Sequence, residues 1–299
     1  METILEVKKL KKKIGKTEIL HDISFSVFEN EIVGFVGPNG AGKSTTMKCI
    51  TGLFKVPKDM VYIMGKDMYD HHVEALRYLG ASIEAPALFP DLNGYDHFSM
   101  VANWRKEKKE NLQELYELSG LKKEALKRPV RSYSMGMKQR LMLSLTLIGS
   151  PKLLLLDEPL NGLDPQATFE FREKLLDLRK RNTSILLSSH QLNEVEKICD
   201  RIVFIKDGRI VNSITTEALQ QMQYYTFQLQ PIEKARQVCK KMNLEIREEG
   251  THVSIRFDTP QILNAFFKAV VSENIDIIEV NSADHLEQYY KNLYRNAEK

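Results

Sequence analysis

Nine consecutive residues near the N-terminus have the types and spacing of a loop that binds the phosphates of a nucleotide. The first eight fit the pattern G-x-x-x-x-G-K-[ST], and the nine are Gly37, Pro38, Asn39, Gly40, Ala41, Gly42, Lys43, Ser44 and Thr45. Glycines let successive backbone N–H groups turn inward, and a following helix adds the positive end of its dipole. We expect Lys43 to reach the β and γ phosphates and Ser44 to offer its hydroxyl to Mg²⁺. A chance match in a chain this long is on the order of one in a hundred, so a turn that merely caps a helix is the weaker alternative.

Two further strands are expected to end in residues that could act on a bound phosphate. Residues 153–156 are apolar and deliver Asp157 and Glu158 at the strand's C-terminal end, where ligands of α/β sheets lie. The acids could cap the next loop, but beside a phosphate site we favour an Asp157 that coordinates Mg²⁺ and a Glu158 that activates water. Residues 184–189 end in the same way at His190, which suggests a functional histidine at the same edge.

The elements on either side of the phosphate loop are those that it requires. Residues 31–36 are a short apolar run typical of a buried strand, and 44–53 carry apolar side chains at helical spacing. Residues 73–79 are expected to form a helix that ends at Gly80, followed by a strand over 81–84 that ends on Glu84. Asp164 and the proline after it predict the N-cap and first turn of another helix.

Five elements in this order resemble the ATP-binding subunit of ATP-binding cassette (ABC) transporters. The correspondence is carried by Walker A at 37–45, the signature motif at Ser134 and Gly136, Walker B at 153–158, the D-loop at 161–164 and the switch histidine at His190. It covers residues 1 to about 215. The resemblance implies an α/β P-loop NTPase core of the ABC type, with an antiparallel β subdomain and a helical subdomain at about 85–150.

The resemblance also implies a mechanism and a partner. Two ATP-binding domains would pair head to tail, so that ATP on the Walker A of one meets Ser134, Gly136 and the D-loop Asp164 of the other. The second domain would come from a homodimer or from a different ATP-binding subunit. Glu158 would polarise the attacking water, Lys43 and a Mg²⁺ ion held by Ser44 and Asp157 would neutralise charge, and His190 would contact the γ-phosphate.

Four positions depart from the family's pattern. Ile14 stands where an aromatic side chain usually stacks on adenine, and Met135 and Met137 replace the common glycine and glutamine of the signature. Glu84 stands in place of the Q-loop glutamine, and its carboxylate can ligate Mg²⁺ as an amide does. A glutamate here resembles the bacterial transporters that remove bacitracin, lantibiotics and related peptides. It therefore indicates export of a peptide antibiotic or amphipathic toxin, as in self-protection or antibiotic resistance.

The rest of the chain, 216–299, is expected to form a small accessory α+β domain. Its predicted strands and helices follow the order β-α-β-β-α-β, with a last amphipathic helix over 284–296. We find no phosphate, metal or catalytic pattern in this part of the sequence. Regulation, support of a dimer and a plain packing module remain open, and the packing module is slightly favoured.

The composition limits the partners and the cellular location that we expect for this protein. Lys and Arg number 43 against 40 Asp and Glu, which argues neither for nor against nucleic acid, and we expect no nucleic-acid partner. Three cysteines without C-x-x-C spacing fit a reducing cytosol. The longest apolar stretches, at 141–148 and 153–156, fall short of the roughly 20 residues that span a bilayer. We therefore expect a cytoplasmic protein, peripheral on the cell membrane, that works with a separate permease.

Two rival functions remain at this stage. One is a soluble ABC ATPase that acts in translation or DNA repair, although such proteins usually carry two cassettes or a long coiled-coil insertion. The other is an ATP-binding switch with little turnover, against which the intact Glu158 and His190 argue.

Overall fold

The computed structural model describes residues 2–84, 87–108, 111–221, 223–249, 252–282 and 285–296. The chain divides into two compact units. Unit 1 contains Met1–Gln191 and Lys197–Ser213, and unit 2 contains Leu192–Glu196 and Ile214–Lys299. The described residues of unit 1 form two sheets and those of unit 2 form one, and each unit has its own apolar core.

A six-stranded sheet forms the centre of unit 1, in the order β10-β9-β3-β8-β7-β6. Its strands are β3 (Ile32–Val36), β6 (Leu79–Ser82), β7 (Leu153–Asp157), β8 (Ser184–Ser189), β9 (Arg201–Lys206) and β10 (Arg209–Thr215). The strands β9, β3, β8, β7 and β6 pair in parallel. Every residue of β3, β7 and β8 is buried, as expected for parallel strands that are covered on both faces. The carboxyl ends of these strands therefore meet at one edge.

A second sheet of unit 1 is antiparallel, in the order β2-β1-β4-β5. It contains β1 (Thr3–Ile14), β2 (Thr17–Phe28), β4 (Val61–Ile63) and β5 (Lys66–Asp67). The buried side chains of β2 join the same apolar cluster as Phe35 of β3, and they are Leu20, Ile23, Phe25 and Val27. The predicted antiparallel subdomain is confirmed, and one core holds both sheets together.

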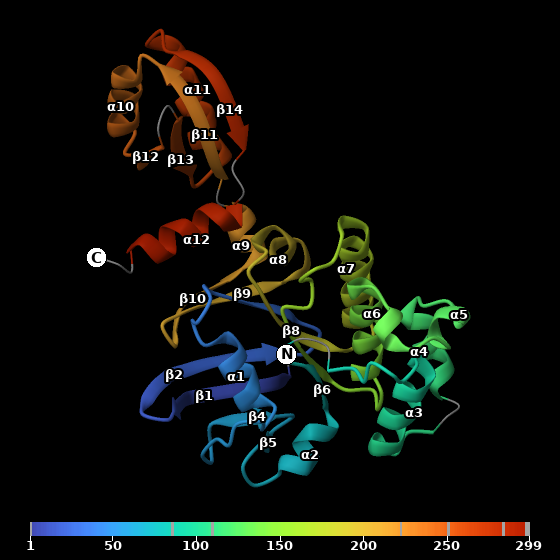
Figure 1. The fold of residues 1–299 in the computed structure, drawn as a ribbon. Coiled ribbons are helices and arrows are strands. Elements are labelled where there is room, and N and C mark those ends of the chain that lie inside the picture. The colour runs from blue at the N-terminus through green and yellow to red at the C-terminus, as the bar shows by residue number, and fades with distance from the viewer. Residues whose placement is uncertain are drawn as a thin grey trace. The chain divides into compact units, whose positions relative to one another are not determined.

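The helices of unit 1 lie along the sheets in Figure 1 or gather in a group of their own. The former include α1 (Lys43–Ile50), α2 (His72–Arg77) and α7 (Pro165–Lys180). The helix α8 (Leu192–Ile198) belongs mostly to unit 2 and ends in unit 1. The group contains α3 (Gly94–Arg105), α4 (Leu112–Ser119), α5 (Lys123–Leu126) and α6 (Met135–Thr146). It has a separate apolar cluster that includes Phe98, Leu112 and Leu141. This cluster accounts for the predicted helical subdomain.

One predicted boundary is wrong. The helix expected over 73–79 ends at Arg77, and the strand expected over 81–84 runs instead from Leu79 to Ser82. Gly80 therefore lies inside a strand. A larger residue does not fit there, because a Cβ would come within 2.2 Å of the backbone oxygen of Thr146. Close packing of the strand against α6, rather than the end of a helix, explains this glycine.

Unit 2 has the predicted β-α-β-β-α-β order. Its elements are α9 (Thr216–Gln221), β11 (Gln223–Gln230), α10 (Ile232–Lys241), β12 (Ile246–Glu249), β13 (His252–Phe257), α11 (Pro260–Ser272), β14 (Asp276–Ser282) and α12 (His285–Asn296). The sheet is antiparallel, in the order β12-β13-β11-β14, and the two central helices α10 and α11 cover one face of it (Figure 1). Phe227, Phe257 and Phe266 meet in its core, with ring centroids 5.2–6.2 Å apart.

Candidate active site

The phosphate loop connects β3 to α1 with the backbone geometry that its glycines permit. Gly40 and Gly42 have φ angles of 80° and 106°, in the region that favours glycine. A Cβ on Gly37 would lie 2.2 Å from the backbone oxygen of Ile205 in β9. The N–H of Gly208 donates to the oxygen of Ala41 at 3.0 Å, so the β9–β10 turn supports the loop from behind. The glycine pattern thus reflects close backbone approach as well as turn geometry.

Lys43 is only 7% exposed and begins α1. Its Nζ donates to the backbone oxygens of Gly37 at 2.8 Å and Pro38 at 3.2 Å, within its own loop. The same Nζ lies 3.9 Å from Oε1 of Glu158. The half-buried Ser44 and Thr45 follow in the first turn. The lysine therefore connects the phosphate loop to the acidic pair at the end of β7.

The acidic pair is held by a residue that sequence reasoning missed. Ser188 of β8 is fully buried, and its hydroxyl donates to Oδ1 of Asp157 at 2.5 Å while it accepts from the N–H of Glu158 at 2.9 Å. Since β8 lies between β3 and β7, Ser188 stands between the phosphate loop and the acids. Glu158 follows β7 with a φ of 49°, in the left-handed region that residues other than glycine seldom adopt. A serine inside an apolar strand was the only signal available in the sequence.

Glu158 contacts groups from both neighbouring segments of the site. Its Oε2 lies 2.9 Å from Nδ1 of His190 and accepts from the His190 N–H at 3.3 Å, while Oε1 faces Lys43. The glutamate side chain is 22% exposed and the histidine side chain 55% exposed. The structure thus brings together Lys43, Asp157, Glu158 and His190, as the sequence predicted from three separate segments.

The predicted signature residues lie at the start of α6. Ser134 is its exposed N-cap and accepts from the N–H of Met137 at 3.3 Å. A Cβ on Gly136 would lie 3.5 Å from Cβ of Ala167 in α7, so Gly136 packs against that helix. Asp164 caps α7 through the N–H of Ala167 at 2.8 Å, which confirms the predicted N-cap. The signature and the D-loop thus form one surface of unit 1.

Glu84, predicted as a metal ligand, is found in another contact. It follows β6 with a φ of 65°, and its exposed carboxylate forms an ion pair with Nζ of Lys48 in α1. Ala85 and Pro86 lie outside the described residues. Of the apolar loop that they begin, Phe89 is exposed, while Leu88 packs against the α3–α6 cluster. Neighbouring apolar side chains of this loop therefore have different surroundings, Leu88 in the cluster and Phe89 in solvent.

Ser44 and Asp157 present a hydroxyl and a carboxylate, the hard oxygen donors that suit Mg²⁺. Asp157 is 6% exposed, at the edge where Ser44 also lies. Among the described residues, no group of three or more His, Cys, Asp and Glu is arranged to hold a metal by itself. A Mg²⁺ ion with few protein ligands that also binds the nucleotide's phosphates fits this donor set.

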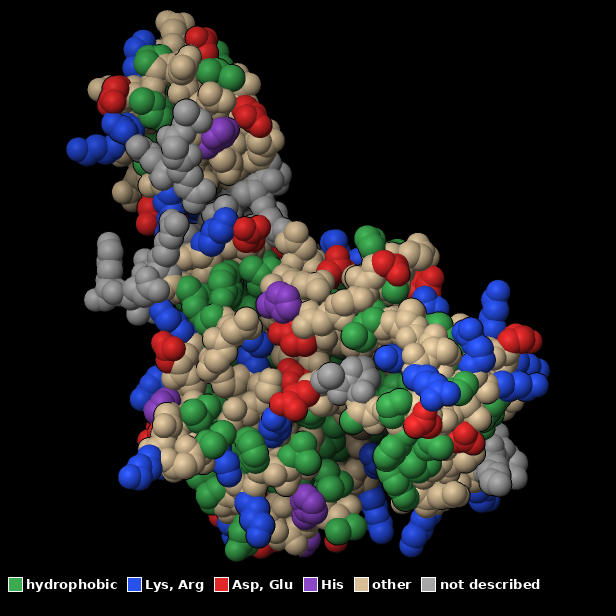
Figure 2. All heavy atoms as spheres, in the orientation of Figure 1, with side chains coloured by type: hydrophobic (Ala, Val, Ile, Leu, Met, Phe, Trp, Pro, Cys, Tyr) green, Lys and Arg blue, Asp and Glu red, His purple; other side chains and the backbone are tan. Residues whose placement is uncertain are grey.

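A groove of about 750 Å³ runs between α2, β6 and α3. Leu53, Val73 and Trp104 line it with 67–69% exposure, and the Arg105 guanidinium donates to the oxygens of Leu76 and Leu79. Figure 2 shows hydrophobic side chains on both sides of the hollow.

In the part of the chain that the structure describes, no helix is both long and apolar enough to cross a membrane.

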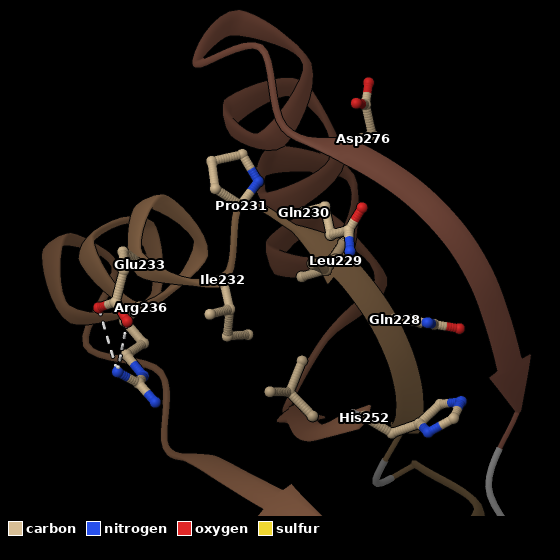
Figure 3. Close-up of a pocket in the computed structure, with 10 residues that line it drawn as sticks. Gln228, Leu229, Gln230, Pro231, Ile232, Glu233, Arg236, His252 and Asp276 are labelled. Atoms are coloured by element: carbon tan, nitrogen blue, oxygen red, sulfur yellow. Dashed lines mark hydrogen bonds and ion pairs between the residues drawn. The ribbon is translucent and has the colours of Figure 1, made fainter. Parts of the chain in front are cut away.

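Unit 2 has a hollow of about 690 Å³ beside the end of β11 (Figure 3). Leu229, Ile232 and Val253 line it together with polar side chains. Arg236 donates to both carboxylate oxygens of Glu233, at 3.0 and 3.1 Å. The charges of Arg236 and Glu233 thus neutralise each other.

Comparisons with known proteins agree with this geometry. Residues 20–161 match the family described as ABC transporter. The chain is 33% identical over 304 residues to the bacitracin transport ATP-binding protein BcrA of Bacillus licheniformis, covering 98% of both chains. It is 39% identical over 208 residues to the lantibiotic transport ATP-binding protein SrtF of Streptococcus pyogenes, covering 70% of this chain and 89% of that one. A solved ATP-binding subunit of an ABC transporter superposes with a TM-score of 0.67 at 30% identity, covering 73% of this chain and 92% of that one.

The fold and the site thus define a P-loop ATPase of the cassette type. This chain belongs to the family of ABC transporter ATP-binding subunits, and it is an ATP-binding ATPase.

Proposed function

We propose that this ATPase energises a separate membrane permease that exports a peptide antibiotic or another amphipathic toxin. The main support for this substrate class is the similarity to BcrA. That similarity extends over 98% of both chains and so includes unit 2. The glutamate at position 84 supports the same class, as the family resemblance suggested. We place residues 1–215 in the ATP-binding domain and 216–299 in an accessory domain.

The site supplies the groups that hydrolysis of ATP requires. Glu158 is the general base that orients the attacking water, and its bonds to His190 hold the carboxylate in place. Lys43 carries the positive charge that offsets the phosphates, and the backbone N–H groups of 37–45 bind the phosphate oxygens. Ser44 and Asp157 would hold Mg²⁺, which neutralises developing negative charge on the phosphates. We assign Glu84 to the same metal when it leaves Lys48.

The sandwich of two ATP-binding domains is supported by the exposure of the signature. Ser134 ends in an exposed hydroxyl at the N-terminus of α6, where a helix attracts phosphate. Asp164 and Gly162 of the D-loop lie beside it, and a Cβ on Gly162 would come within 3.3 Å of Cγ of Met135. ATP on one copy would bind this surface of a second copy or of another ATP-binding subunit.

The groove beside Trp104 is the surface that we assign to the permease. Exposed large apolar side chains that line one hollow are typical of a docking site for a protein. The groove adjoins β6, which leads directly to Glu84. Docking there would place the chain on the cytoplasmic face of the cell membrane and would couple the permease to the ATP site.

The first test compares wild type with Glu158→Gln. Hydrolysis should fall by about 10²–10⁴-fold, since a general base contributes about that much. The variant should still bind ATP and should accumulate as a dimer by light scattering. Glu114→Gln is the matched control, because that carboxylate lies on the surface of α4 in a pair with Arg181. Wild type that binds ATP without hydrolysing it, even with its permease, would support a binding-only switch instead.

The second test concerns the substrate. Cells that express the chain with its permease should tolerate bacitracin or a lantibiotic better than cells without it, and Lys43→Ala should abolish the difference. If tolerance is unchanged while hydrolysis is normal, the ATPase stands and the proposed substrate class is wrong.

A further inference from the structure

The ion pair between Lys48 and Glu84 lies outside the set of groups that hydrolyse ATP. Glu84 is the carboxylate that the sequence assigned to the metal, yet it contacts an ammonium group of the helix after the phosphate loop. The Lys48 side chain is 24% exposed and that of Glu84 is 63% exposed. The pair joins the end of β6 to α1, two segments 36 residues apart.

Lys48 is placed so that it can act on the metal site through Glu84. It is four residues after Ser44 on α1, and side chains at this spacing share one face with Cβ atoms about 5–6 Å apart. The oxygen of Lys48 accepts from the N–H of Phe54 at 2.9 Å, and its Nζ lies 5.7 Å from the Phe54 ring centroid. Lys48 therefore lies one helical turn beyond Ser44, and its ammonium group is near both the Glu84 carboxylate and the Phe54 ring.

We propose that Lys48 is a positioning residue that competes with the metal for the carboxylate of Glu84. Bound to Lys48, the carboxylate is neutralised and held beside the site. When the nucleotide and its metal occupy the site, Glu84 must exchange the ammonium for the cation in order to act as a ligand. This inference rests on the assignment of Mg²⁺ to Ser44 and Asp157.

A purely structural role is the alternative. Exposed ion pairs contribute little to folding stability, and more than half of the Glu84 side chain is in water. Loss of the pair should therefore leave the thermal midpoint nearly unchanged. A change in metal affinity at constant thermal stability separates positioning from folding.

The experiment is a double-mutant cycle of Lys48→Met and Glu84→Gln in the full chain. The first readout is the dissociation constant of Mn²⁺, measured by electron paramagnetic resonance with a non-hydrolysable ATP analogue. The second is the Mg²⁺ concentration for half-maximal hydrolysis. Lys48→Met should tighten metal binding by about two- to fivefold, the range that a pair of this exposure supports. In the Glu84→Gln background the same substitution should have no tightening effect.

Two control variants should leave metal binding unchanged. Lys48→Arg should behave as wild type, and Lys66→Met, which breaks the similar Lys66–Glu74 pair at 3.1 Å, should not change metal binding. An unchanged or weaker metal affinity in Lys48→Met, or an equal change in both backgrounds, would overturn the role of Lys48. If wild type instead hydrolyses ATP without a divalent cation, the assignment of Mg²⁺ itself fails.

Discussion

Unit 1 and unit 2 are both built from sheets and helices, but they differ in where their charged groups lie. In unit 1, Lys43 and Asp157 are buried at the edge of the parallel sheet, and Glu158 lies between Lys43 and His190. In unit 2, charged side chains pair on the surface, as Arg236 does with Glu233, around a core of phenylalanine rings. Burial of charge is costly unless the groups are bound. The buried, bound charges of unit 1 therefore identify it as the unit that carries out chemistry.

The two units also differ in why particular residues are required. Gly37 is required by a close approach to Ile205, whereas Phe227 of unit 2 is required only by the volume that it fills. Function in unit 1 therefore depends on single atoms, while unit 2 depends on packing. Substitutions in each unit can test this contrast.

The largest effect on ATP affinity is expected for Gly37→Ala. The new Cβ would lie 2.2 Å from a backbone oxygen, so the phosphate loop or β9 must move. We expect ATP binding, measured by calorimetry, to fall by two orders of magnitude or more, about 3 kcal/mol. Gly40→Ala, in the same loop, is the control, because its φ is 80° but nothing lies within 4 Å of the added Cβ. Equal losses in the two variants would show that glycine flexibility, rather than close approach, shapes the loop.

Phe227→Ala tests unit 2 in the same way. Removal of this fully buried ring should destabilise unit 2 by about 3–5 kcal/mol, the usual cost of a phenylalanine-to-alanine change in a core. Scanning calorimetry should show one unfolding transition moved to lower temperature, while ATP binding at temperatures below it stays as in wild type. Loss of ATP binding in the folded variant would contradict the division of labour between the units.

Much of this contrast could be predicted from the sequence. The phosphate loop, the acids after β7 and His190 were predicted because each comes directly after an apolar strand, and the carboxyl ends of parallel strands meet at one edge. Ser188 was missed because a buried serine in a strand has no pattern of its own until its partners are known. The Lys48 contact of Glu84 was missed because ion pairs between distant segments depend on tertiary geometry. The boundary error at Gly80 arose because a packing glycine and a helix-ending glycine look alike.

Two buried serines provide a smaller test. Ser188 binds Asp157 and the Glu158 N–H, while Ser254 of unit 2 lies 3.2 Å from the hydroxyl of Thr226. Ser188→Ala should lower kcat by about tenfold, since a lost hydrogen bond to a charged group costs about 1.5–3 kcal/mol and part of it is recovered by relaxation. Ser254→Ala should cost about 1 kcal/mol of stability and leave kcat unchanged. Phosphate release and chemical denaturation measure the two quantities, and a kcat effect from Ser254→Ala would refute the contrast.

The smallest effects are expected in the pH dependence of stability, with opposite signs in the two units. In unit 1, burial raises the pKa of Asp200 above 3.8, although the Ile32 N–H and Arg179 oppose the shift. The folded state then favours the protonated acid, so this contribution is present below pH 3.8 and is lost as pH rises through the folded pKa.

In unit 2, hydrogen bonds from Asn281 and His252 lower the pKa of Glu279 below 4.5. That contribution is present above pH 4.5 and is lost as pH falls through the folded pKa. Denaturation of wild type, Asp200→Asn and Glu279→Gln between about pH 3 and 6 measures both slopes. As pH rises, the stability of wild type relative to Asp200→Asn should fall, while that relative to Glu279→Gln should increase. Slopes of the same sign would mean that water reaches Asp200 as readily as it reaches Glu279, and that the burial of charge does not distinguish the two units at this position.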